Sequence, residues 1–324
     1  MIETWALLPT LLTGFGGGLL VGARRGLPFI KREPTDWAIT LYEGESPLAL
    51  RPSLRCRHPL LQARDVTDLD AELVADPFLY RYQQQWYLFF EVLNRRRQLG
   101  EIAYASSHDG EQWHYQRRVL SEPFHLSYPH LLRWQGEHYM IPESHQDESI
   151  RLYRATRFPD QWQLERRLLS GHPFVDSTPF YHQQQWWIFT STPHNDQLML
   201  YYADTLQGPW HAHPASPVVH RNARISRPAG RVLHYQGQLI RLAQDDADGY
   251  GRAVRAFVIT HLSRHRYTEQ PLSGKPLIAA AGGMRWNSRG MHHLDAWPQD
   301  DGRWIAAVDG QGRRYRFGWC WRRS

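Results

Sequence analysis

The chain has 324 residues, of which 42% are hydrophobic, 13% aromatic and 22% charged, so it can bury one large core or two small ones. Its 38 Lys and Arg residues against 32 Asp and Glu residues give a net charge of +6 that is spread along the sequence, which excludes the concentrated basic face of a nucleic-acid-binding domain. Two cysteines, Cys56 and Cys320, exclude a disulfide-based framework.

The first 34 residues form an apolar, glycine-rich arm. Its stretch WALLPTLLTGFGGGLLVGA, residues 5–23, has about the minimum length of a membrane helix. Five glycines and Pro9 weaken it as a helix, and the acidic Glu3 ahead of it fits a signal peptide poorly. Arg24 and Arg25 would keep the following domain cytoplasmic if the segment inserted. Membrane contact through this arm and docking of the arm on the domain both stay open, and we expect a cytoplasmic protein in either case.

From residue 35 onward the sequence repeats a strand–turn–strand unit. The copy DPFLYRYQQQWYLFFE begins at Asp76 and aligns without a gap with YPHLLRWQGEHYMIPE from Tyr128 and DSTPFYHQQQWWIFTS from Asp176. Weaker copies begin at Arg227 and His292, so the starts lie about 50 residues apart with a longer last interval. Each copy joins two aromatic and β-branched runs through a short polar turn, a pattern typical of β-hairpins.

Further strand-like runs that end in tryptophan lie between the first copies: GEIAYASSHDGEQW, SIRLYRATRFPDQW and QLMLYYADTLQGPW. We interpret the three tryptophans as packing residues. Each repeat thus holds about four strands, the content of one propeller blade. The sequence predicts an all-β fold in which residues 35–324 form a five-bladed β-propeller, with blades that start near residues 76, 128, 176, 227 and 292, preceded by the short N-terminal arm.

The innermost strands of a propeller surround one central channel, so the repeat starts should meet at its rim. These residues are Asp76, Tyr128, Asp176, Arg227 and His292. Glu91 and Glu143 end the second strands of two repeats and should lie beside them. Carboxylates bind hydroxyl groups and aromatic rings stack on the C–H faces of sugars, so this set favours a carbohydrate ligand.

The same residues also have simpler interpretations. Asp76 before Pro77 is a common turn sequence, and Glu143 at a strand end can be a solvated carboxylate. Glu91 can form an ion pair with the basic run NRRRQ that follows it, and Arg227 can cap a turn. Otherwise Arg227 would bind an anionic group of a ligand.

Polar and histidine-rich stretches elsewhere suggest further rim groups but no metal site. Gln244 and Asp245, in the stretch AQDDADGYG, are interpreted as polar rim groups, because that stretch lacks the EF-hand pattern. The spacing of the histidines matches no standard zinc motif. These histidines are His125, His130, His292 and His293. We therefore expect no metal and no cofactor.

The stretch ADPFLYRYQQQWYLFFE resembles the first-blade motif of glycoside hydrolase families 43, 32 and 130, in which the aspartate is the base or nucleophile. Over roughly residues 35–270 the chain more closely resembles the N-terminal domain of glucosamine inositolphosphorylceramide transferases and its bacterial relatives. The blocks that carry this resemblance include EPFHLSYPHLL, YMIPES, IRLYRATRFPDQW, VDSTPFY, WWIFTS and SRPAGR. It implies a propeller that acts in surface-glycan or glycolipid metabolism.

The resemblance implies that Asp76 is the base or nucleophile and Asp176 a second carboxylate that modulates it. Family 43 opens its third blade with the general-acid glutamate, whereas Asp176 stands at that position here, so Glu143 becomes the candidate acid. We expect the ligand, a glycan, glycolipid or sugar nucleotide, to be bound by seven further residues. These are Glu91, Tyr128, His130, Arg227, Gln244, Asp245 and His292.

Three functions follow from these assignments. The first is an enzyme that cleaves or transfers a glycosyl unit with paired carboxylates. The second is a non-catalytic module that binds a sugar or sugar nucleotide for a partner glycosyltransferase, which the missing third-blade glutamate favours. The third is a scaffold that binds a protein on an apolar rim.

Overall fold

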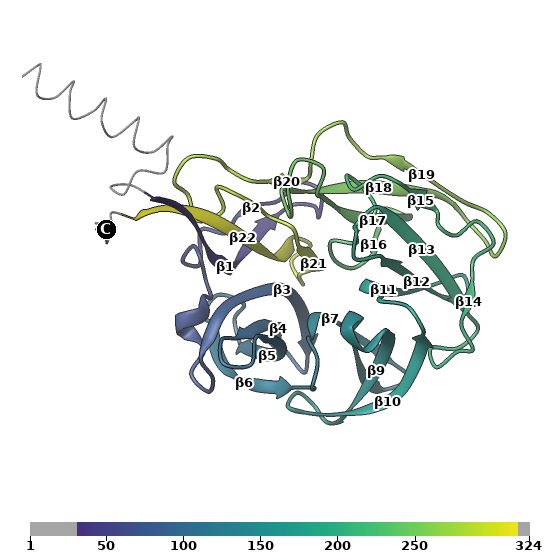
Figure 1. Ribbon diagram of the computed structural model, residues 1–324, viewed down its shortest axis with the longest axis horizontal. Coiled ribbons are helices and arrows are strands. Elements are labelled where there is room, and N and C mark those ends of the chain that lie inside the picture. Colours follow the sequence, from purple (N-terminus) through teal and green to yellow (C-terminus); the bar gives the residue numbers. More distant parts are fainter. Residues whose placement is uncertain (1–30, 317–324) are drawn as a thin grey trace, which may run out of the picture.

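The computed structural model describes residues 31–316, which form five antiparallel β-sheets arranged as the blades of a propeller (Figure 1). The prediction of an all-β, five-bladed propeller is confirmed. Apart from strands, these residues contain two short 3₁₀ turns, η1 (Ala63–Asp65) and η2 (His145–Asp147). None of the helices within residues 31–316 has the length and apolar character needed to cross a bilayer.

Four blades are built from consecutive segments of the chain, each running from the inner strand to the outer one. The first contains β3 (Ala71–Tyr82), β4 (Gln85–Asn94), β5 (Leu99–Ser107) and β6 (His114–Leu120). The second contains β7 (Ser127–Trp134), β8 (Glu137–Glu143), β9 (Ser149–Arg157) and β10 (Gln161–Ser170). The third contains β11 (Val175–His182), β12 (Gln185–Ser191), β13 (Gln197–Ala203), β14 (His211–Ala212) and β15 (Val219–His220). The fourth contains β16 (Leu233–Tyr235), β17 (Gln238–Asp245), β18 (Ala253–Leu262), β19 (Tyr267–Pro271) and β20 (Ile278–Ala279).

The fifth blade joins the two ends of the described chain. Its inner strands are β21 (Leu294–Pro298) and β22 (Trp304–Arg316), and its outer strands are β1 (Lys31–Gly44) and β2 (Arg51–Pro52). Strand β1 pairs with β22 along most of its length, so hydrogen bonds close the ring. Residues 31–34, which the sequence pattern assigns to the arm, therefore belong to β1. The rest of the arm, residues 1–30, lies outside the described residues.

The glutamine-containing stretches of the repeats are tight turns between the first two strands of the first four blades. Four hairpins have a two-residue turn in which both residues have positive φ: Gln83-Gln84, Gln135-Gly136, Gln183-Gln184 and Gln236-Gly237. Positive φ at both positions is what a type I′ turn requires, and its twist matches that of the flanking strands. These two-residue turns, which all begin with glutamine, therefore fix the register of the inner hairpin in the first four blades.

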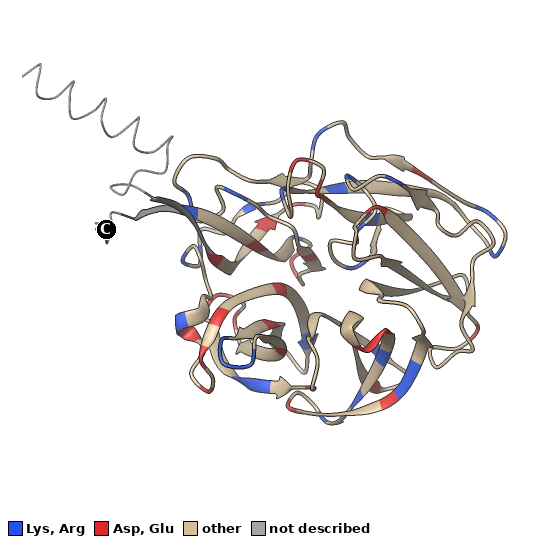
Figure 2. Cartoon of the chain, viewed as in Figure 1, with Lys and Arg blue, Asp and Glu red and all other residues tan. Residues whose placement is uncertain are grey.

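Three tryptophans that recur in the repeats pack between blades, as the repeat pattern predicts. Trp113, Trp162 and Trp210 each contribute to a different hydrophobic cluster of the core. Their indole N–H groups donate to the carbonyl oxygens of Gly110, Pro159 and Leu206, at 3.0, 2.8 and 3.1 Å. Charged residues are distributed over all five blades (Figure 2).

Candidate functional site

Three of the five repeat-start residues share an uncommon backbone conformation. Asp76, Tyr128 and Asp176 have φ angles of 51°, 46° and 50°. At each of them the pairing between the inner and second strands skips a position, as in a β-bulge. Such a bulge breaks the alternation of side chains along the strand, and it turns these three toward neighbouring blades at the axis. Arg227 and His292 lie just before the inner strands of the last two blades.

Asp76 belongs to a buried cluster with His292 and Asp309, which lies in β22. The Nδ1 atom of His292 lies 2.8 Å from Asp309 Oδ1, and its Nε2 atom lies 3.3 Å from Asp76 Oδ1. The backbone N–H groups of Asp76, His292 and His293 also donate to Asp309, at 3.0–3.1 Å. Burial opposes the charge of Asp309, but His292 and these donors hold its pKa below the usual value. Burial likewise opposes the charge of His292, but Asp309 and Asp76 raise its pKa to about 9.

The carboxyl group of Asp76 is only 4% exposed, and this burial raises its pKa to about 7, although His292 opposes the shift. Its Oδ2 atom accepts the N–H of Tyr128 at 3.3 Å. Its Oδ1 atom is buried and has no hydrogen-bond partner among the described residues. Asp76 is therefore a carboxyl group that gains or loses a proton near neutral pH, and its Oδ1 atom faces His292 Nε2 at 3.3 Å without a hydrogen bond.

The raised pKa of His292 predicts a pH dependence of stability. Because its pKa rises from 6.5 to about 9 on folding, its stabilising contribution is complete below pH 6.5 and is lost as the pH rises through 9. The free energy of unfolding should fall across that range by on the order of 3 kcal/mol from this group. Urea denaturation at several pH values measures this, and His292→Gln should flatten the slope whereas the exposed control His261→Gln should not. An unchanged slope in His292→Gln would contradict the assignment.

Asp176 belongs to a second buried cluster, with Glu143 and Arg227. The guanidinium Nε of Arg227 donates to Asp176 Oδ2 at 2.6 Å, and its Nη2 lies 3.7 Å from Glu143 Oε2. Glu143 also accepts the backbone N–H of Asp176 at 3.0 Å and lies 2.8 Å from Nδ1 of His145. Burial opposes its charge, but His145 and Arg227 lower its pKa to about 2. Burial, together with Glu143 and Asp76, raises the pKa of Asp176 well above its usual value against the effect of Arg227.

The two clusters have the same arrangement of charges. In each, one buried cation lies between two carboxyl groups. One of these, Asp309 or Glu143, accepts several hydrogen bonds and has a lowered pKa. The other, Asp76 or Asp176, has a raised pKa and an Oδ1 atom without a hydrogen-bond partner. The two aspartates that match in the sequence repeat are thus also the two with a buried Oδ1 atom that forms no hydrogen bond with the described residues.

Tyr128, a third repeat-start residue, connects the second blade to the third and fourth blades. Its buried hydroxyl group lies 2.8 Å from Thr178 Oγ1 and accepts the N–H of Gly230 at 2.7 Å. Tyr128→Phe should lower the free energy of unfolding by about 1–3 kcal/mol, because the Gly230 N–H would be left buried without an acceptor. Chemical denaturation measures the loss. Tyr181→Phe, which removes the hydroxyl of an exposed ring, is the control, and equal losses in both variants would contradict this role.

The other predicted rim residues differ in their surroundings. Gln244 joins the second cluster, since its Nε2 atom donates to Asp176 Oδ2 at 2.8 Å and its Oε1 atom is free. Glu91 lies 3.3 Å from Nε2 of His125 rather than pairing with the basic run that follows it. Asp245 accepts from Arg224 at 3.1 Å and from Arg255 at 2.7 Å, so its carboxylate is engaged in ion pairs away from the two clusters.

His130 and the neighbouring His293 lie beside the first cluster, with Nδ1 of His293 3.9 Å from Asp76 Oδ1. Their rings pack against Phe78, at centroid distances of 5.0 and 4.7 Å, and all four ring nitrogens are buried without a hydrogen-bond partner among the described residues. Burial lowers the pKa of His293 to about 3 and that of His130 well below its usual value. Both imidazoles are therefore neutral.

Residues in loops complete the site and have no counterpart in the repeat. The ring of Tyr250, which is 51% exposed, lies 5.4 Å from Arg227 Cζ and 5.4 Å from the ring of His292. Asn195 accepts from Arg227 Nη1 at 3.2 Å and donates to Asp246 at 2.9 Å. The signal that could have indicated Tyr250 is an aromatic residue between two glycines in DGYG.

Asp76, His292 and Asp309 form the one group of three within residues 31–316 whose potential metal-ligand atoms lie within 4.8 Å of one another. Both ring nitrogens of His292 face carboxylate oxygens, which is the arrangement of a protonated imidazole. A metal ion would have to displace that proton, so the donor set fits an ion pair better than a metal site. The absence of a metal stays a prediction.

Comparison with known sequences gives one family. The family model described as glucosamine inositolphosphorylceramide transferase 1, N-terminal, matches residues 31–311. The protein named glucosamine inositolphosphorylceramide transferase 1 from Oryza sativa subsp. japonica is 36% identical over 297 residues, which cover 85% of this chain and 40% of the relative. The chain therefore spans about two fifths of the length of the curated relatives that it matches.

Comparison with solved structures gives glycoside hydrolases. A family 117 glycoside hydrolase from Zobellia galactanivorans has a TM-score of 0.51 and 12% identity, over 91% of this chain and 96% of the hydrolase. The catalytic domain of a family 62 α-L-arabinofuranosidase from Coprinopsis cinerea has a TM-score of 0.54 and 15% identity, over 86% and 97% of the two chains. At these identities the likeness establishes a shared fold.

Proposed function

The chain belongs to the family of N-terminal domains of glucosamine inositolphosphorylceramide transferases, and we propose that its axial site binds a glycan and cleaves or transfers a glycosyl unit. The observation that carries this proposal is the pair of matched aspartates. Asp76 and Asp176 both have raised pKa values and a buried Oδ1 atom that forms no hydrogen bond with the described residues. A protonated carboxyl group in this position suits proton donation to a glycosidic oxygen.

In this proposal Asp76 is the group that exchanges a proton, since its pKa of about 7 matches neutral conditions. Asp176 binds a sugar hydroxyl group, and Glu143 remains ionised. Asp76 thus takes the acid role that the sequence pattern gives to Glu143, because Glu143 accepts its hydrogen bonds as an anion. Arg227 holds Asp176 and Glu143 in place, since its guanidinium is already engaged by them and by Asn195.

The half-exposed ring of Tyr250 offers a stacking surface for a sugar at the mouth of the site. The name of the relatives contains glucosamine and inositolphosphorylceramide. A glycan or glycolipid that carries an amino sugar is therefore the first substrate class to test.

A specific observation favours a second function, a sugar-binding module that assists a glycosyltransferase. Asp76, Glu143 and Asp176 are 4%, 5% and 0% exposed. The two carboxylates with lowered pKa values, Asp309 and Glu143, also lie against several donors, so neither is free to act as a nucleophile. In this case the transfer chemistry would belong to a partner, and the axial site would hold the sugar.

One experiment separates the two functions. Binding and product formation are measured on the same panel, which contains glucosamine, N-acetylglucosamine, glucose, mannose and galactose with their nitrophenyl glycosides. Binding together with product supports the enzyme. Binding without product supports the module, and binding of no member contradicts both functions.

A further inference from the structure

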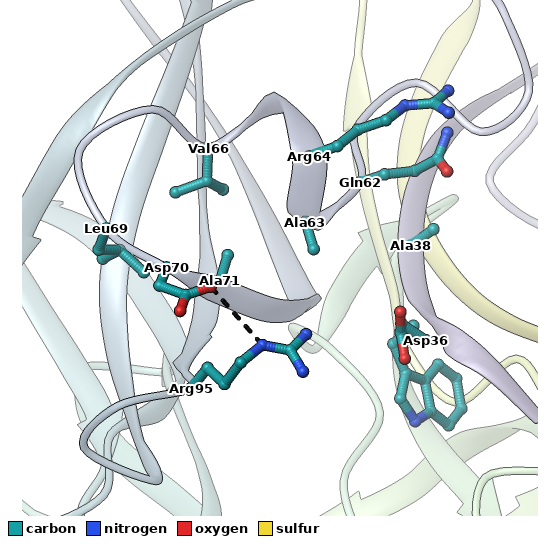
Figure 3. A pocket seen from close by; sticks show the side chains of 11 residues that line it. Asp36, Ala38, Gln62, Ala63, Arg64, Val66, Leu69, Asp70, Ala71 and Arg95 are labelled. Carbon is teal, nitrogen blue, oxygen red and sulfur yellow. Dashed lines mark ion pairs between the residues drawn. The ribbon is translucent and has the colours of Figure 1, made fainter.

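A pocket of about 550 Å³ lies between strand β1 of the closing blade and the segment that runs from η1 into β3 (Figure 3). This volume falls within the range of roughly 300–1,000 Å³ that is usual for small-ligand sites. The residues that matter for its chemistry are Asp36, Trp37, Gln62, Arg64 and Arg95.

Charges of both signs line this pocket. Asp36 and Arg64 form no hydrogen bond or ion pair with any described residue. The Nε atom of Arg95 lies 3.6 Å from Asp70 Oδ1, and the far end of its guanidinium points into the pocket (Figure 3). An anion would be repelled by Asp36 and a cation by the two arginines. A neutral polyol suits charged groups of both signs, because its hydroxyl groups donate to the carboxylate and accept from the guanidinium groups.

The walls between these groups are apolar. Ala63, Val66, Leu69 and Ala71 line one side of the pocket, and Ala38 lies on the opposite strand. Sugars present C–H faces as well as hydroxyl groups, so alternating apolar and polar walls suit a saccharide better than a fully charged ligand.

Trp37 connects this pocket to the axial site. Its ring lies 4.2 Å from that of His292, which contacts Asp76, and 6.3 Å from the ring of Tyr250. Ala71 at the start of β3 lines the pocket, and Asp76 lies five residues further along the same strand. At about 3.3 Å per residue the two positions are at most about 17 Å apart, since irregular pairing near Ala71 and Asp76 can only shorten the strand. A trisaccharide can bridge that distance and a monosaccharide cannot.

We propose that this pocket is a second subsite, which binds the inner sugar residues of a neutral oligosaccharide whose terminal unit occupies the axial site. This inference rests on the proposed function and gives the ligand a minimum length of about three residues. It places the ligand across the boundary between the first and closing blades.

Calorimetry with matched mono- and trisaccharides tests the subsite. The pairs are N-acetylglucosamine with triacetylchitotriose, glucose with maltotriose, and mannose with mannotriose. We expect at least one trisaccharide to bind about tenfold more tightly than its monosaccharide. Arg95→Ala and the isosteric Asp36→Asn should remove this gain without weakening the monosaccharide.

Arg96→Ala is the matched control. Arg96 also approaches Asp70, at 3.8 Å, but its side chain is 84% exposed and does not line the pocket, so this variant should keep the gain. The inference is overturned if no trisaccharide binds more tightly than its monosaccharide. It is also overturned if Arg95→Ala keeps the tighter binding of the trisaccharide. Monosaccharide binding that depends on Asp76 without any trisaccharide gain would leave the proposed function standing and reject the second subsite alone.

Discussion

Asp76→Asn should lower the turnover of a glycan substrate by roughly 10²–10⁴-fold, the range that general acid–base groups contribute. Asparagine keeps the shape of the side chain but cannot supply a proton to a glycosidic oxygen. It also tolerates the left-handed backbone at this position, where φ is 51°, better than alanine would. Its amide oxygen can still accept the N–H of Tyr128, so the fold should be preserved.

The same variant has a second readout that does not require a substrate. With Asp76 neutral, His292 would retain one carboxylate partner, Asp309, instead of two. The pKa of His292 should therefore fall below the value of about 9 that Asp76 and Asp309 produce together. NMR titration of His292 measures this shift, and circular dichroism checks the fold.

Asp300→Asn is the control for both readouts, because Asp300 is 83% exposed and pairs with Arg81 on the surface. Undiminished turnover in Asp76→Asn would contradict the catalytic role of Asp76. If the wild-type protein binds sugars without turnover, the expected effect of Asp76→Asn is a loss of affinity.

Arg227→Ala should lower the free energy of unfolding by about 3–5 kcal/mol, because it leaves buried carboxyl groups without their cation. The side chain of Arg227 is 13% exposed, and those of Asp176 and Glu143 are 0% and 5% exposed. Arg227→Lys should recover only part of the loss, since one ammonium group cannot reach Asp176, Glu143 and Asn195 in the geometry of the guanidinium.

Denaturation at neutral and acidic pH tests the electrostatic origin of this effect. Protonation of Asp176 and Glu143 removes the unpaired charge, so the deficit of Arg227→Ala should shrink as the pH falls. Arg224→Ala is the matched control, because Arg224 is 43% exposed and its partner Asp245 keeps Arg255. Equal losses in the two alanine variants, or a deficit that does not change with pH, would contradict the role of Arg227.

The blades could be predicted because their signal is local and repeated. The copies that begin at Asp76, Tyr128 and Asp176 align without a gap, since each inner hairpin has the same two-residue turn. In the fifth blade Pro298 pairs with Trp304 across a longer loop, which weakens the alignment there. Asp309 lies beyond that loop, and so its part in the first cluster was missed.

Other features depend on contacts between distant segments. The pairing of β1 with β22 joins the two ends of the described chain, and no local sequence pattern predicts it. The ionised state of Glu143 depends on His145 and on the N–H of Asp176, which the bulge directs toward it. Tyr250 and Asn195 lie in loops outside the repeat. The sequence could therefore indicate the two aspartates but not the partners that set their pKa values.

A crystal structure with the monosaccharide that binds most tightly in the panel tests the account most directly. We expect its hydroxyl groups to lie within hydrogen-bond distance of both Asp76 Oδ1 and Asp176 Oδ1, with its ring against Tyr250. A sugar bound elsewhere, with both oxygens still unpartnered, would contradict the assignment of the axial site.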